Sequence, residues 1–367
     1  MKSTTKIIVG LSVIVILISM IGYNVINRDE SIKVGSILIL SGSGASWGET
    51  AKNSIELAVQ DINQNKILSK EIKVIYEDDQ GDPSKTVTAF SKLTNSDDVD
   101  FIIGPTWSRS AVAIKPLINN VVVISPSVGS AEFNQGNEFI FNTRQHDYIL
   151  SQNLAQYVFN KGFRQAAVLS AQDVYNIEQA NAFKVEFEKL GGSVQITLEP
   201  QRNQADVRGE LLKVKENQEI DVIILTTGGQ EVTSTFGRQM KELQIDLPVF
   251  SLTLDQTVID NCKGACDNWV FLSAFTPTPE FQEKYKTVYG KNVEIGGDSA
   301  YDAMVMLALA MKETGSTDPK IIAQHLSQIK EYEGVSGHLF ADGEGGFTKN
   351  YVVKGIRNSG EQFILVE

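Results

Sequence analysis

The chain alternates short apolar runs with stretches in which apolar residues recur every three or four positions. The first run, residues 32–40, is rich in Ile, Val and Leu, and residues 48–63 follow with Ile55, Leu57 and Ile62 at helical spacing. The first segment predicts a buried strand and the second an amphipathic helix. The same order recurs along the chain, which predicts parallel sheets with helices on both faces.

This alternation falls into two series, in keeping with a length of 367 residues, which suits two domains. The first series predicts further elements at 72–76, 83–93, 101–103, 108–118 and 121–124. After a polar stretch at 130–137, the second series predicts strands at 139–142, 166–169, 194–198 and 222–225, and helices at 147–159, 177–190, 206–216 and 230–243. The C-terminal third adds helices at 279–289, 298–314 and 318–329 and strands at 337–340 and 351–356, which have to join the two lobes.

The first 28 residues depart from this pattern. The chain as a whole has 42% hydrophobic and 21% charged residues, as soluble folded proteins do. Within residues 1–28, Lys2 and Lys6 precede an uncharged apolar run at 7–27, and Arg28 follows it. This order predicts a signal peptide or an N-terminal membrane anchor, and the lack of an Ala-x-Ala cleavage site favours the anchor. Both interpretations predict an extracytoplasmic protein, in the periplasm or at the cell surface, with the positive end on the cytoplasmic side.

The charge balance bears on partners. The chain has 33 basic and 45 acidic residues and a net charge of −12. Because the positive charges before position 29 have no acid beside them, the exported part is more acidic still. Such a surface repels phosphate backbones, so we expect no nucleic-acid binding.

Cys262 and Cys266 are the only two cysteines. In an oxidising compartment, cysteines four residues apart can close a small loop, so we predict a disulfide between them. The alternatives are a metal site, for which two further ligands are not evident nearby, and two free thiols.

Three loops that follow predicted strands are rich in glycine and hydroxyl side chains. Residues 41–48 read Ser-Gly-Ser-Gly-Ala-Ser-Trp-Gly, residues 104–110 read Gly-Pro-Thr-Trp-Ser-Arg-Ser, and residues 125–130 read Ser-Pro-Ser-Val-Gly-Ser. Ligands of open α/β sheets bind beyond the carboxyl ends of strands, so these loops predict a binding site. A carboxylate could bind at Ser108, at the start of a helix, although simple helix capping explains that serine equally well.

The glycines of residues 41–48 raise the alternative of a dinucleotide-dependent enzyme. However, Trp47 would crowd a pyrophosphate, and the acids after the second predicted strand are clustered at 77–79 instead of single. The chain has three histidines, no Gly-x-Ser-x-Gly motif and no metal-ligand cluster, which argues against a hydrolase. We therefore expect no catalysis, no cofactor and no metal.

Short segments along nearly the whole exported part share a pattern with one family. They are Ile32-Lys33-Val34-Gly35, Ser41-Gly42, Trp47-Gly48, Leu57-Ala58-Val59-Gln60-Asp61-Ile62-Asn63, Glu77-Asp78-Asp79-Gln80-Gly81-Asp82-Pro83, Ile103-Gly104-Pro105, Ile124-Ser125-Pro126-Ser127, Tyr301-Asp302-Ala303 and Tyr332-Glu333-Gly334-Val335-Ser336-Gly337. In order and spacing they resemble the Leu/Ile/Val-binding proteins, the type I periplasmic-binding family of branched-chain amino-acid ABC importers.

The resemblance implies an α/β fold of two lobes, each with an open, mainly parallel sheet and flanking helices, joined by a three-crossover hinge. It also implies that the chain visits the first lobe twice. On this basis lobe 1 comprises residues 31–145 plus 278–333, and lobe 2 comprises residues 146–277 plus 334–367. The final crossover is expected near residues 333–337.

The family's binding residues carry over onto the strand-end loops. By resemblance, the Ser108 hydroxyl and N–H groups around Ser127 and Gly129 would hold a ligand carboxylate. Aromatic rings would cover its apolar part, and a carboxylate of lobe 2 would accept its ammonium group. The implied ligand-binding residues are Trp47, Ser108, Ser127, Val128, Gly129, Tyr175 and Asp255, and further contacts are expected from Trp107, Arg109 and Arg144.

Some positions depart from the family's pattern. Gly129 stands where these proteins often have a hydroxyl, the loop at 226–231 lacks the frequent tyrosines, and residues 141–147 lack the usual arginine and proline positions. The ligand therefore stays open among amino acids, amides, urea-like compounds and aromatic acids. Arg109 and Arg144 would serve an acid, or form solvated salt bridges.

The function implied is capture of a small amino-acid-like solute for the membrane permease of an ABC importer. A ligand-sensing ectodomain of the same fold is the main alternative. It is disfavoured because only about six residues precede the apolar run and no output domain is recognisable, so a signal would need a partner protein.

Overall fold

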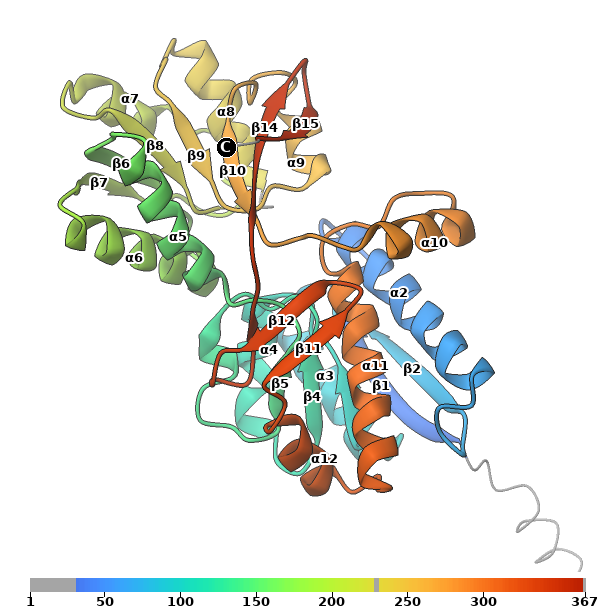
Figure 1. The fold of residues 1–367 in the computed structure, drawn as a ribbon. Helices are drawn as coiled ribbons and strands as arrows, with labels where there is room; N and C mark the ends of the chain where they lie inside the picture. Colours follow the sequence, from blue (N-terminus) through green and yellow to red (C-terminus); the bar gives the residue numbers. More distant parts are fainter. Residues whose placement is uncertain (1–30, 228–230, 366–367) are drawn as a thin grey trace, which may run out of the picture.

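The computed structural model describes residues 31–227 and 231–365, which form two α/β lobes and a small third sheet (Figure 1). The predicted signal or anchor segment, residues 1–28, lies outside the described residues. Within the described residues, no helix combines the length and the apolar character needed to cross a membrane.

Lobe 1 contains a parallel five-stranded sheet in the order β2-β1-β3-β4-β5. Its strands are β1 Ile32–Leu38, β2 Ile72–Asp78, β3 Phe101–Ile103, β4 Val122–Ser125 and β5 Ile140–Asn142. Its helices are α2 Ala45–Gln64, α3 Pro83–Asn95, α4 Ser108–Ile114, α10 Pro279–Tyr289, α11 Gly297–Thr314 and α12 Pro319–Leu326, with 3-10 turns η1 Lys115–Leu117 and η2 Ala131–Phe133. Apolar residues of α2, α11 and α12 share one core with the sheet, so the C-terminal helices complete this lobe.

Lobe 2 has a seven-stranded sheet in the order β15-β14-β10-β9-β8-β6-β7, parallel except for β14 and β15. Its strands are β6 Gln165–Leu169, β7 Ser193–Leu198, β8 Val222–Leu225, β9 Val249–Ser251, β10 Val270–Ser273, β14 Val352–Arg357 and β15 Glu361–Ile364. Its helices are α5 Asp147–Asn160, α6 Val174–Lys189, α7 Arg208–Glu216, α8 Glu231–Glu242 and α9 Gln256–Asn261. Two apolar clusters, one on each face, enclose this sheet.

Several helices begin at a side chain that caps the free backbone N–H groups. Asp82, Thr278 and Asp318 each accept hydrogen bonds from the first turn of α3, α10 and α12, and a proline follows each of them. Proline suits the first helical position because its missing N–H would have had no partner there. These local signals fix where the helices start.

The segment 337–348 departs from the predicted division. Strands β11 Glu331–Gly334, β12 Gly337–Ala341 and β13 Phe347–Thr348 form an antiparallel sheet that belongs to lobe 1, not to lobe 2. Leu339 and Phe347 pack against Met306 of α11. The last crossover therefore lies near residues 348–352 instead of 333–337.

Two contacts explain why the chain stays on lobe 1 so long. The buried Asp302 carboxylate of α11 accepts hydrogen bonds from the N–H groups of Val335 and Ser336, at 2.9 and 2.9 Å. These bonds anchor the turn between β11 and β12. Strand β5 pairs with β4 in the sheet of lobe 1. This pairing corrects the assignment of residues 139–142 to the second apolar series and agrees with the lobe 1 range of 31–145 that the resemblance implies.

Three segments connect the lobes, near residues 142–147, 273–279 and 348–352. In lobe 2, Cys262 and Cys266 form a disulfide, with their Cα atoms 5.7 Å apart, directly after α9. Both cysteines are buried in the core beside Trp269.

Candidate functional site

The strand orders of the two sheets locate the site. In lobe 1, β1 and β3 are neighbours whose following helices lie on opposite faces, and β6 and β8 stand in the same relation in lobe 2. At such a switch point the loops after the strands diverge and leave a crevice, which is where ligands of open α/β sheets bind. Loops after all four strands line one cleft between the lobes, of about 1110 Å³ with its opening to solvent included.

The cleft brings together nine of the ten residues expected to contact a ligand. They are Trp47, Trp107, Ser108, Arg109, Ser127, Gly129, Arg144, Tyr175 and Asp255. Val128 is the exception. Its side chain is buried in the core of lobe 1, and its N–H donates to the Ser125 hydroxyl at 3.0 Å, so neither group is open to a ligand.

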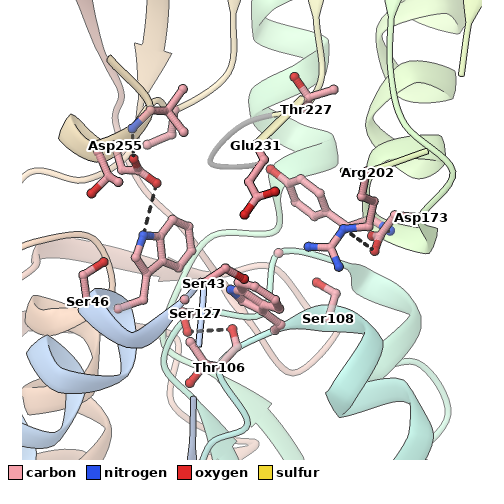
Figure 2. Close-up of a pocket in the computed structure, with 18 of the residues that line it drawn as sticks. Ser43, Ser46, Thr106, Ser108, Ser127, Asp173, Arg202, Thr227, Glu231 and Asp255 are labelled. Atoms are coloured by element: carbon pink, nitrogen blue, oxygen red, sulfur yellow. Dashed lines mark hydrogen bonds and ion pairs between the residues drawn. The ribbon is translucent and has the colours of Figure 1, made fainter. Parts of the chain in front are cut away.

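The two serines expected to hold a carboxylate differ in what they can donate. Ser108, the first residue of α4, accepts the Ser130 N–H at 3.3 Å, which leaves its hydroxyl proton for an acceptor in the cleft. Ser127 donates its hydroxyl proton to the Thr106 carbonyl at 2.9 Å, as Figure 2 shows. Among the described residues, the N–H of Gly129 has no hydrogen-bond partner. Ser108 and Gly129 therefore each offer a free donor to the cleft.

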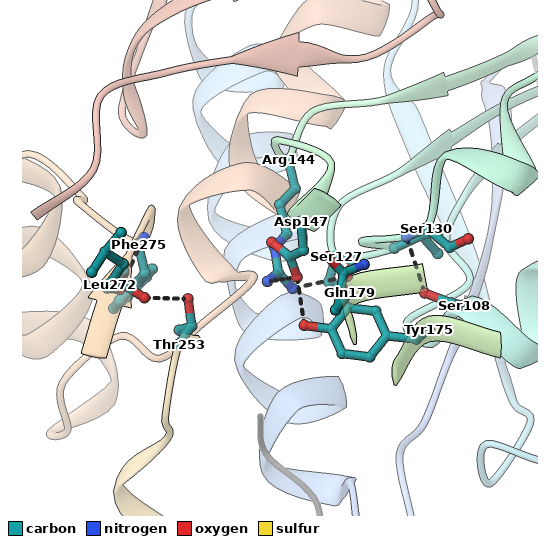
Figure 3. A network of polar contacts seen from close by, with 12 residues as sticks. Ser108, Ser127, Ser130, Arg144, Asp147, Tyr175, Gln179, Thr253, Leu272 and Phe275 are labelled. Atoms are coloured by element: carbon teal, nitrogen blue, oxygen red, sulfur yellow. Dashed lines mark hydrogen bonds and ion pairs between the residues drawn. The ribbon is translucent and has the colours of Figure 1, made fainter. Parts of the chain in front are cut away.

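A buried network of Arg144, Asp147 and Tyr175 lies beside Ser127 (Figure 3). The Arg144 guanidinium donates to Asp147 Oδ2 at 2.6 Å and to the Ser127 carbonyl at 3.1 Å. The Tyr175 hydroxyl donates to the same Asp147 oxygen at 2.8 Å. The network thus joins the first crossover to a binding loop of lobe 1 and to α6 of lobe 2.

This network also explains the glycine that departs from the family's pattern. A Cβ atom on Gly129 would lie 2.6 Å from Asp147 Oδ2 and 2.8 Å from the Tyr175 ring, closer than real Cβ contacts. Burial opposes the charge of Arg144, but the Asp147 carboxylate raises the pKa of Arg144 above its usual value. Burial, followed by the charge of Asp147, raises the pKa of Tyr175, so its hydroxyl stays protonated. Arg144 is consequently paired within the protein, and it also lines the cleft.

Trp47 and Asp255 meet across the cleft. The indole N–H of Trp47 in α2 donates to Asp255 Oδ2 at 3.3 Å, and Asp255 Oδ1 accepts the Val258 N–H at 2.7 Å and so caps α9. Burial raises the pKa of Asp255 to about 6. Part of this carboxylate is therefore engaged within the protein.

Three charged residues of lobe 2 that the sequence analysis did not single out also line the cleft. Asp173 directly precedes α6, the helix after β6, and Glu231 is the first residue of α8, the helix after β8. Arg202 follows β7. Arg202 pairs with Asp173 at 3.4 Å, and the exposed Glu231 points into the cleft (Figure 2). The strand-end rule, applied to lobe 2 as it was to lobe 1, would have found them.

Two lobes whose switch points face each other across one cleft define the fold and site of a solute-binding protein. The model of the family described as periplasmic binding protein matches residues 31–358. The chain belongs to this family.

Named relatives and solved structures agree with this placement. Leu/Ile/Val-binding protein BraC3 of Rhizobium johnstonii is 24% identical over 84% of this chain and 86% of its own length. The structure of a leucine binding protein, LivK, from Thermotoga maritima has a TM-score of 0.83 and 23% identity over 91% of this chain and 98% of that one. An ABC-transporter solute binding protein from R. palustris in complex with 4-hydroxybenzoate has a TM-score of 0.84 and 19% identity over 92% and 96% of the two chains. At these identities the solved structures share the type I periplasmic-binding fold.

Proposed function

We propose that this chain is the extracytoplasmic binding component of an ABC importer, and that it captures a small amino-acid-like solute or a related carboxylate or amide. The observation that carries the proposal is the single cleft in which hydroxyl and N–H donors of lobe 1 face carboxylates and an aromatic ring of lobe 2. The names of the relatives support it, since they bind branched-chain amino acids or an aromatic acid. The membrane permease of the importer would be its partner.

Each wall has a distinct part in this proposal. The Ser108 hydroxyl and the Gly129 N–H hold the solute's carboxylate, because neither donor has an acceptor within residues 31–227 and 231–365. The rings of Trp47 and Tyr175 cover the apolar part. An ammonium group is met by Asp255 or Glu231, and Glu231 is the more open of these two carboxylates because Asp255 also caps α9.

Closure of the lobes adds contacts to the bound solute, and these contacts contribute to the free energy of binding. A solute shifts the equilibrium between open and closed forms only by binding the closed form more tightly. Here the closed form adds the contacts of lobe 2 to those of lobe 1 around the same solute. The three crossovers are the segments that would bend.

A thermal-shift screen against amino acids, amides and small carboxylates would identify the solute, because a specific ligand raises the melting temperature by mass action. With that solute, Ser108→Ala removes a hydrogen bond to a charged group. We expect affinity to fall about tenfold to hundredfold in calorimetry. Ser84→Ala, an exposed serine on α3, is the matched control and should bind as the unaltered protein does. Unchanged affinity in Ser108→Ala would reject the carboxylate role.

A further inference from the structure

The cleft continues past Trp107 into an outer chamber. Five residues line both spaces: Ser43, Trp107, Arg109, Arg202 and Glu231. The outer chamber adds the amide side chains of Gln172, Gln201 and Asn203. Ser108 and Gly129, the donors proposed to bind a carboxylate, line the inner cleft but not the outer chamber. The site therefore has room for a second polar group of a solute that extends beyond Trp107.

Two guanidinium groups approach the Trp107 ring at this junction, one from each lobe. The Cζ atom of Arg109 lies 5.3 Å from the ring centroid and that of Arg202 lies 5.0 Å from it. Arg109 forms no ion pair with any residue in 31–227 or 231–365, and its buried Nε has no hydrogen-bond partner there. Arg202 pairs with Asp173.

The two arginines repel each other across the cleft. Burial lowers the pKa of Arg202, the charges of Asp173 and Glu231 offset part of this, and the charge of Arg109 lowers it further. Like charges on opposite lobes oppose closure. An anion placed between them would turn this repulsion into attraction and would stabilise the closed form.

We propose that the captured solute carries a second acidic group, and that this group binds between Arg109 and Arg202 against Trp107. The inference rests on the proposed function, because the first carboxylate is the one held at Ser108. Glu231 borders the same junction and would repel a solute that carries acids alone. The solute class is therefore an amino acid or short peptide with one ammonium group and two carboxylates.

The test is calorimetry with matched acid and amide pairs. We would use L-glutamate with L-glutamine, and γ-L-glutamylglycine with its C-terminal amide. In at least one pair, the acid should bind about tenfold or more tightly than the amide, since hydrogen bonds to charged groups are the stronger ones. Arg109→Gln and Arg202→Gln should each remove that preference, so that the ratio of acid affinity to amide affinity falls to about one.

Arg208→Gln is the matched control, because Arg208 lies in lobe 2 and pairs with Glu242 outside the cleft. It should keep the preference, and equal melting temperatures would show that the variants fold. The inference is overturned if both members of each pair bind equally, if the arginine variants weaken acid and amide alike, or if no acid of the panel binds. Binding of neutral amino acids in those cases would leave the proposed function standing.

Discussion

The two walls of the cleft differ in kind. Lobe 1 presents serine hydroxyls, a backbone N–H and two indoles, with Arg109 and the Asp147-paired Arg144 as cations. Lobe 2 presents one phenol ring and four charged residues, Asp173, Arg202, Glu231 and Asp255. We infer that lobe 1 binds the carboxylate that many solutes share, and that lobe 2, together with Arg109, distinguishes among them by charge. Affinity and selectivity would then be separable by mutation.

The walls nevertheless depend on each other through the network of Arg144, Asp147 and Tyr175. Asp147→Asn should have the largest effect, because it leaves Arg144 buried without a compensating charge; the side chains are 12% and 1% exposed. Removing one partner of a buried ion pair costs about 3–5 kcal/mol, so the free energy of unfolding in urea should fall by about that amount. The binding loop at Ser127 should also lose its order, because Arg144 anchors the Ser127 carbonyl.

Asp206→Asn serves as the control for that change. Asp206 pairs with Arg208 on the surface of lobe 2, where both side chains are largely exposed. Exposed pairs contribute little to stability, so this variant should unfold like the unaltered protein. If Asp147→Asn behaved in the same way, the network would not be what joins the two walls.

Gly129→Ala should have the next largest effect. The new methyl group would press on Asp147 and Tyr175, and such overpacking costs about 1–3 kcal/mol of stability. The methyl group of Gly209→Ala, at the start of α7, would meet no atom of the described part of the chain within 4 Å, so this change should instead stabilise the protein by about 0.5–1 kcal/mol. Opposite signs in urea unfolding would support the close approach at Gly129; a stabilised Gly129→Ala would contradict it.

Much of this fold is readable from the sequence, because buried parallel strands and amphipathic helices leave strong periodic signals. Strands such as β1 and β8 and helices such as α2 and α11 lie where the apolar pattern predicts them. The placement of β12 and β13 is not readable in this way. Their assignment to lobe 1 depends on Asp302, which lies far away along the chain and binds the β11–β12 turn.

The candidate site shows the same limit. The strand-end loops predicted Ser108, Ser127 and Gly129 as binding residues. No local pattern shows that the Ser127 hydroxyl donates to the Thr106 carbonyl, or that Asp147 forms an ion pair with Arg144. Those facts come from residues that tertiary packing brings together. The sequence therefore predicts which loops of lobe 1 line the cleft, and tertiary packing determines which of their polar groups can bind a ligand.

The smallest expected effect concerns pH and the wall of lobe 2. Burial, followed by the charge of Glu294, raises the pKa of Asp255 to about 6, while the Val258 N–H and Trp47 favour its charged form. Asp255 is thus ionised at pH 7.5 and mostly protonated at pH 5, and only the carboxylate attracts an ammonium group. If Asp255 binds that group, affinity for an amino acid found in the screen should fall by up to about tenfold between these pH values.

Asp255→Asn should bind more weakly at pH 7.5 and lose most of this pH dependence in calorimetry. A variant that kept the full pH dependence would show that Asp255 is not its source and would contradict the role of Asp255 in binding the ammonium group.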